Sequence, residues 1–160
     1  MLSVEIVQQM TAYNYAAHRR VWGHIMALTD DQFTTDIPYS HGSIRNHMVH
    51  LANVDRAWLG GLQELPDPRI HRRDPADFST KESVHALCQT AADEVTQYVS
   101  TLDEAALKQQ LEGLPMPTWQ VLLHLVNHGT DHRAQVLRAL HDLGASTLEQ
   151  DVVYYVMQWQ

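Results

Sequence analysis

The sequence predicts an all-α fold, a four-helix bundle with long loops between helices 1 and 2 and between helices 2 and 3. Three observations support this prediction. Four stretches repeat apolar residues at the period of an amphipathic helix. Capping residues, glycines and prolines separate these stretches. Alternating Val, Ile and Thr runs are nearly absent, and the chain has no Asn-Gly or Asp-Gly hairpin signal. Four helices with one apolar face each bury those faces against one another in a bundle.

The first half of the chain contains two of the predicted helices. The first covers 3–29, with Ser3 as its N-cap. Residues 30–42 are rich in Asp and Thr and contain Pro and Gly, which predicts a loop. Ser43 caps the second predicted helix, which ends near Leu62.

The second half contains the other two helices. Residues 65–78 combine three prolines with charged residues, which predicts another long loop. A Ser-x-x-Glu capping box at Ser79 opens the third helix, which fades near Gln110. Thr118 is the expected N-cap of the fourth helix, which ends at Leu143 before a C′ glycine.

No internal repeat, low-complexity tract or linker interrupts the pattern, so we expect residues 1–160 to form one domain. The final segment, 148–159, is apolar and aromatic. It is expected either as a short helix or as an extended tail packed on the bundle.

Composition and charge exclude several classes of function. The 160 residues carry a formal net charge of -8, which argues against nucleic acid and against an anionic membrane surface as partners. A single cysteine, Cys88, allows neither an intramolecular disulfide nor a cysteine-based zinc site. No basic, apolar leader opens the chain and no apolar run reaches membrane-spanning length. We therefore expect a soluble cytoplasmic protein.

The chain is rich in histidine, with 11 in 160 residues. Three of them, His124, His128 and His132, follow one another at four-residue intervals in the fourth predicted helix. Side chains four apart are neighbours on a helix, and two imidazoles at that spacing can bind one metal ion. On a helical wheel His128 and His132 point into the apolar stripe and His124 lies at its edge. The pattern allows two interpretations, a metal site or core histidines hydrogen-bonded to protein groups.

A metal site needs at least a third ligand, and the second predicted helix offers two candidates. His47 lies in the middle of its apolar stripe and His50 lies toward one edge. An edge residue can reach sideways to a neighbouring helix, so geometry does not choose between them. Three histidine ligands would leave a coordination position open, as in catalytic rather than structural sites.

Two segments resemble the DinB family. The segment Ser43-Ile-Arg-Asn-His-Met-Val-His50 is similar to its helix-2 motif, in which a capped turn precedes a ligand histidine by seven residues. The segment Asn127-His128-Gly-Thr-Asp-His132-Arg133-Ala-Gln135 resembles its helix-4 signature, although Asp131 and Ala134 depart from the usual residues. The resemblance spans nearly the whole chain, and it selects His50 over His47.

The resemblance implies a divalent metal held by His50, His128 and His132 inside a four-helix bundle. Zinc or nickel are the first expectations, with iron or manganese as further options. It also implies a homodimer and, by analogy with family members, a metal-dependent thiol S-transferase or a hydrolase, with a low-molecular-weight thiol as one substrate class. The alternative is a non-enzymatic metal-binding or stress-related dimeric module, and a third hypothesis is a metal-free bundle.

No catalytic residue can be assigned from the sequence. The candidates for a general base are His47, His124 and Asp131, with Asp131 favoured as a surface residue. The remaining histidines other than His24 are expected in solvent or in loops: His18, His41, His71, His85 and His141.

Overall fold

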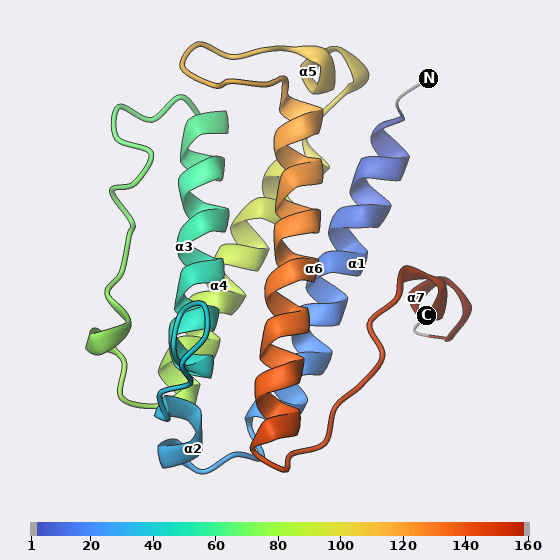
Figure 1. Ribbon diagram of the computed structural model, residues 1–160. Helices are drawn as coiled ribbons and strands as arrows, with labels where there is room; N and C mark the ends of the chain where they lie inside the picture. Colours follow the sequence, from blue (N-terminus) through green and yellow to red (C-terminus); the bar gives the residue numbers. More distant parts are fainter. Residues whose placement is uncertain (1–2, 159–160) are drawn as a thin grey trace.

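The computed structural model describes residues 3–158, and within that range every regular element is helical (Figure 1). Four helices are long: α1 (Val4–Ile25), α3 (Ile44–Leu62), α4 (Lys81–Ser100) and α6 (Thr118–Asp142). Four elements are short: α2 (Asp30–Thr34), the 3-10 turn η1 (Pro75–Asp77), α5 (Glu104–Lys108) and α7 (Val152–Gln158). The all-α bundle prediction is therefore confirmed.

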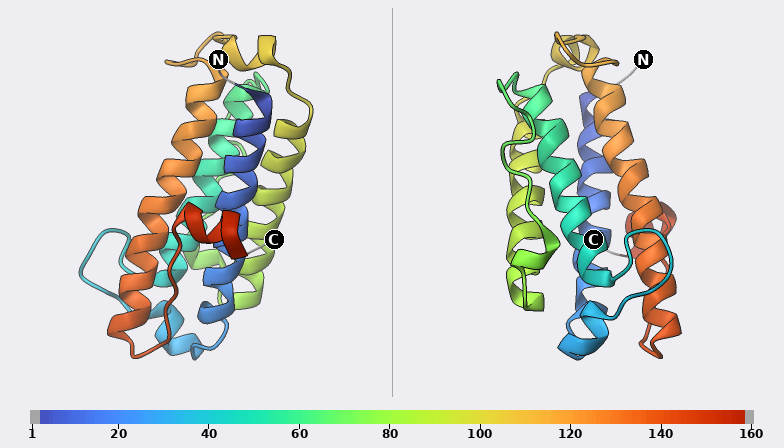
Figure 2. Two further views of the ribbon diagram at one scale, coloured as in Figure 1. Left: turned by 90° about the vertical axis from the view of Figure 1, so that its right-hand side faces the viewer. Right: turned by 60° about the vertical axis from the view of Figure 1, so that its left-hand side comes forward.

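The four long helices form a bundle in which each packs against two others. Helices α1 and α3 both contact α4 and α6, so α1 and α3 lie on opposite corners. Helices α1 and α6 run in one direction and α3 and α4 in the other (Figures 1 and 2). Since α3 and α4 are parallel, the segment between them must return along the length of the bundle. No described helix combines the length and the apolar character that crossing a membrane requires.

The helix ends show where local signals were sufficient. Ser43 caps α3 as predicted, its Oγ accepting a hydrogen bond from the Asn46 backbone N–H at 3.1 Å. The N-cap of α4 is Thr80, one residue after the predicted Ser79. Thr118 does not cap α6 but is its first residue, and its hydroxyl donates to the Gln109 carbonyl at 3.2 Å. Thr80 caps α4 through a local bond, its hydroxyl accepting the Ser83 backbone N–H at 3.2 Å, whereas Thr118 bonds to a residue nine positions earlier.

The other differences lie in short helices within predicted loops and at helix ends. The first helix ends at Ile25, and α2 forms inside the predicted loop 30–42. The third predicted helix is divided into α4 and α5. The final segment runs extended to Asp151 and then forms α7, so both predicted conformations occur; Trp159 lies outside the described residues.

The apolar core fills both ends of the bundle. One cluster includes Ile25, Phe33 and Met48, and the other includes Leu59, Val99 and Leu122. Polar residues on the same helices are also buried, and four of them lie between the two clusters in sequence: His18, Asp55, His132 and Arg133. The middle of the bundle is therefore polar, and both clusters of polar side chains described below lie there.

Candidate metal centre

Five histidines come together where α3 faces α6, and we call them the histidine cluster: His41, His47, His50, His128 and His132. His128 and His132 are one helical turn apart on α6, and their ring centroids are 4.3 Å apart. The His50 ring on α3 lies 5.1 Å from that of His128 and 4.7 Å from that of His132. The structure thus brings together the three residues that the resemblance selected.

Two pairs of ring nitrogens, which have no histidine in common, are each spaced as two ligands of one cation would be. The Nε2 atoms of His50 and His128 are 3.1 Å apart, and the Nδ1 atoms of His47 and His132 are 3.4 Å apart. Two nitrogens that bind one tetrahedral ion at about 2.0 to 2.1 Å each lie about 3.3 Å from one another. In addition, the buried Nδ1 of His128 has no hydrogen-bond partner. The histidines present therefore fit a divalent metal ion.

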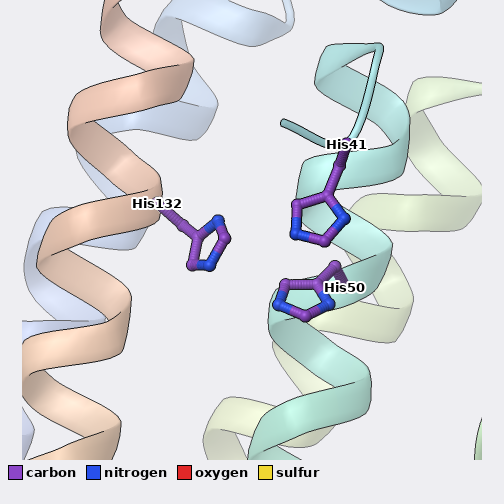
Figure 3. A group of neighbouring side chains, drawn as sticks. All are labelled: His41, His50 and His132. Carbon is purple, nitrogen blue, oxygen red and sulfur yellow. The ribbon is translucent and has the colours of Figure 1, made fainter. Parts of the chain in front are cut away.

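His41 joins this cluster although the sequence analysis placed it among solvent or loop residues. It lies in the loop before α3, but its side chain is half-buried and its ring stacks on His50 with centroids 3.9 Å apart. The ligand nitrogens of His41, His50 and His132 all lie within 4.8 Å of one another, and the three rings face one another across the gap between α3 and α6 (Figure 3). No helical periodicity could have revealed a loop residue.

The alternatives left open by the sequence have distinct positions. Both His47 and His50 reach the cluster, because the apolar stripe of the second predicted helix, now α3, and one edge of that stripe both face α6. His124 lies one turn before His128 on α6, and its ring is 5.6 Å from that of His128 and 5.2 Å from that of Trp58. Asp131 is exposed and accepts a hydrogen bond from Gln135, in agreement with the surface role that was favoured.

The histidines of the cluster are neutral at neutral pH. Burial first, and then repulsion from neighbouring imidazoles, lowers the pKa of His50 to about 3 and that of His47 and His128 to about 4. Burial also lowers the pKa of His41 and His132. Because a metal binds the deprotonated imidazole, these shifts favour the form that acts as a ligand.

A large cavity of about 1090 Å³ opens beside the cluster, and His41 and His50 are among its walls. Its other walls come from α3 and from the segments 68–75 and 113–115. Trp58, Val54 and Leu114 supply apolar surface. A volume of this size admits a small-molecule ligand.

Two glycines near the end of α3 allow the cavity walls to approach. A Cβ on Gly60 would stand 2.8 Å from the Pro68 carbonyl oxygen, and one on Gly61 would stand 2.9 Å from Leu114. A larger residue at Gly60 would push the backbone at Pro68 away from α3, and one at Gly61 would displace the Leu114 side chain. These glycines therefore shape the cavity.

A second set of buried polar groups lies behind the cluster, and we call it the arginine network: Asn14, Thr130, Arg133 and Gln150. Arg133 is fully buried and donates to Gln150 Oε1 at 2.8 Å and to Asn14 Oδ1 at 2.5 Å. His18, which was expected in solvent or a loop, is buried beside this network because Gly129 leaves room for it.

A model of the DinB family matches residues 1–160. The chain belongs to the DinB family. Proteins of this family generally bind metals, with which the histidine cluster is compatible. A solved structure of a DinB-like protein from Bacillus cereus ATCC 10987 matches the fold, with a TM-score of 0.66 and 16% identity over 88% of this chain and 94% of that one. No curated protein matches the chain.

Proposed function

We propose that this DinB-family chain is a metal-dependent enzyme of the thiol S-transferase or hydrolase type, with His50, His128 and His132 as ligands. The observation that supports this most strongly is the position of His50. Its Nε2 lies 3.1 Å from that of His128, and the same residue lines the large cavity. A ligand set that faces a cavity leaves room for a substrate beside the metal.

A divalent ion bound there would lower the pKa of a coordinated water or thiol and provide a nucleophile at neutral pH. The chain's own residues would orient the reaction. His47 contacts His132 through Nδ1, and His41 stacks on His50, so both limit the rotation of the proposed ligands. Trp58, Val54 and Leu114 would hold the apolar part of a substrate against α3. Imidazole ligands suit zinc and nickel, with iron or manganese as further options.

Metal content tests the proposal. We expect about one divalent ion per chain in untagged protein purified without chelator, and its loss in H50A and in H128A/H132A. The matched control is H71A/H141A, which removes two exposed histidines outside the cluster. Absence of metal after reconstitution with zinc, nickel, iron and manganese would contradict the proposal, as would full metal retention in H128A/H132A. Loaded protein is then assayed for thiol transfer and hydrolysis.

His41 supports the second candidate, a non-enzymatic metal-binding module. Its ligand nitrogen belongs to the group within 4.8 Å that includes His50 and His132, so it could close the open coordination position. A closed site is structural rather than catalytic. In the enzyme, H41A keeps the metal and retains thiol transfer or hydrolysis. In the module, H41A weakens metal binding and wild type has neither activity.

We also propose that the chain forms a homodimer through α7. Its valines and methionine are exposed, with relative exposures of 40% for Val152, 49% for Val153 and 71% for Met157. Tyr155, in contrast, packs on Tyr13 of its own bundle. Light scattering should give a dimer mass for wild type and a monomer mass for V153D/M157D. A monomeric wild type would contradict this proposal.

A further inference from the structure

A basic segment borders the cavity of this acidic protein. The chain has 11 Lys and Arg residues, and three of them, Arg69, Arg72 and Arg73, lie within five positions. All three are exposed and all three line the cavity. Among the described residues none of the three forms an ion pair, whereas Arg56, Lys81 and Arg138 do. The described part of the cavity lining therefore contains three arginines without ion pairs and one carboxylate, that of Asp74.

The nearby carboxylates have other partners. Asp67 Oδ1 accepts the Arg69 backbone N–H at 3.0 Å, and Asp74 Oδ1 accepts the Ala76 backbone N–H at 2.9 Å. Each of these carboxylates therefore has one oxygen bonded to a backbone N–H of its own loop. Arg73 uses one side-chain nitrogen, which donates to the Arg72 carbonyl at 3.4 Å. Most of the guanidinium donors remain available to a ligand.

Specific contacts hold this segment against α3. The Asn53 side chain accepts the Arg73 backbone N–H at 2.8 Å and donates to the Arg73 carbonyl at 2.8 Å. Pro68 lies against Gly60, two turns farther along α3. The segment thus runs antiparallel to α3 beside it (Figure 1). Asn53 follows His50 by three residues, a rise of about 4.5 Å along the helix. The Arg73 backbone, which is bonded to Asn53, therefore lies about one helical turn from His50 along α3.

We propose that Arg69, Arg72 and Arg73 bind an anionic group, a carboxylate or a phosphate, of the small-molecule substrate whose reacting atom lies at the histidine cluster. This inference rests on the proposed function above, because it assigns one part of the substrate to the same cavity. Arginine forks match the geometry of carboxylate and phosphate oxygens. The wall formed by Trp58, Val54 and Leu114 fits an apolar portion between the two ends. The substrate class is therefore a small amphipathic anion.

The test is a nuclear magnetic resonance titration of the full chain, zinc-loaded and metal-free, with inorganic phosphate or succinate. Sodium chloride keeps the ionic strength constant. Anion concentrations up to about 50 mM detect dissociation constants in the millimolar range. We expect saturable shifts of the amide signals of residues 69–73 and of the Asn53 side chain. The anion that binds more tightly identifies the group as phosphate or carboxylate.

The variant R69Q/R72Q/R73Q should weaken binding at least tenfold. The matched control R19Q/K108Q/R138Q makes the same change of net charge at exposed positions outside the cavity and should bind as wild type does. Equal affinity in the two variants, or no saturable shift in wild type, would overturn the inference. Metal content is measured separately, so metal binding without anion binding overturns this inference alone. Anion binding without metal binding overturns the proposed metal site alone.

Discussion

Neighbouring residues of α6 belong to two polar clusters that differ in how their hydrogen bonds are satisfied. His128 and His132 meet His50 and His47 of α3, whereas Gly129 and Arg133 face Asn14 of α1. Positions one apart on a helix point about 100° away from each other, so one helix can serve two clusters.

The arginine network supplies its own partners. Arg133 donates to two side-chain amide oxygens and to the Thr130 hydroxyl, at distances between 2.5 and 3.0 Å. The histidine cluster instead pairs imidazole nitrogens with one another and leaves His128 Nδ1 without a partner. Buried polar groups that satisfy one another stabilise a fold, and groups that do not are candidates for ligand binding. We therefore expect the first cluster to determine stability and the second to determine function.

The largest effect is expected from Arg133→Met. It leaves the buried oxygen of Asn14 and the half-buried oxygen of Gln150 without their donor, and it releases the segment that carries Gln150. We expect the free energy of unfolding in urea to fall by about 3 to 5 kcal/mol. Arg138→Met, which removes an exposed arginine of the same helix, should change it little. A loss below about 1 kcal/mol for Arg133→Met would contradict a structural role.

The next effect is a pH dependence from Asp55, which is buried and accepts the Tyr15 hydroxyl at 3.1 Å. Burial raises its pKa from 3.8 to about 7. Between these values the folded chain keeps a proton that the unfolded chain has released, so stability falls as pH rises through this range. Asp55→Asn cannot ionise, and its stability relative to wild type should rise by about 4 kcal/mol from pH 4 to pH 8.

Measuring the difference between Asp55→Asn and wild type cancels the titration of the histidines, which contributes equally to both. Urea unfolding at several pH values gives this difference. A constant difference between pH 4 and pH 8 would show that Asp55 has an ordinary pKa in the folded chain.

A smaller effect is expected at Gly129, where a Cβ would stand 2.9 Å from Arg133 Nη1 and would also contact Asn14 Oδ1. Gly129→Ala should lower the thermal stability by about 1 to 2 kcal/mol because the arginine network must shift. Gly23→Ala is the matched control, since a Cβ on Gly23 meets nothing within 4 Å. It should stabilise α1 by up to about 1 kcal/mol. Equal responses of the two variants would show that the network adapts freely.

The smallest effect on the metal-free chain is expected from His128→Ala/His132→Ala. These two side chains pair with other imidazoles, those of His50 and His47, and their removal should change the free energy of unfolding by less than about 1 kcal/mol. Zinc should raise the melting temperature of wild type, because it binds only the folded chain, and should leave that of the double variant unchanged. A large destabilisation of the metal-free double variant would show that the histidine cluster, like the arginine network, has a structural role.

Much of the fold was determined by the sequence alone. Apolar periodicity and Ser43 placed α3 at residues 44–62, and the same signals placed α6 to within one residue at its carboxyl end. Helical periodicity also predicted that His128 and His132 face the core, and the resemblance to the DinB family selected His50. These are local properties, since a helix face is defined by spacing along one chain segment.

Only the tertiary structure decided which groups meet. His41 reaches the cluster because a loop folds back on α3, and Arg73 lies beside Asn53 because the segment after α3 returns along that helix. Gly60 and Gly61 lower the helix propensity at the end of α3, and in the folded chain they allow Pro68 and Leu114 to approach that helix. Such contacts depend on close approach between segments distant in the chain, for which helical spacing contains no signal. The sequence therefore determined the helices and the faces of their histidines, and tertiary packing decided the cavity and its charge.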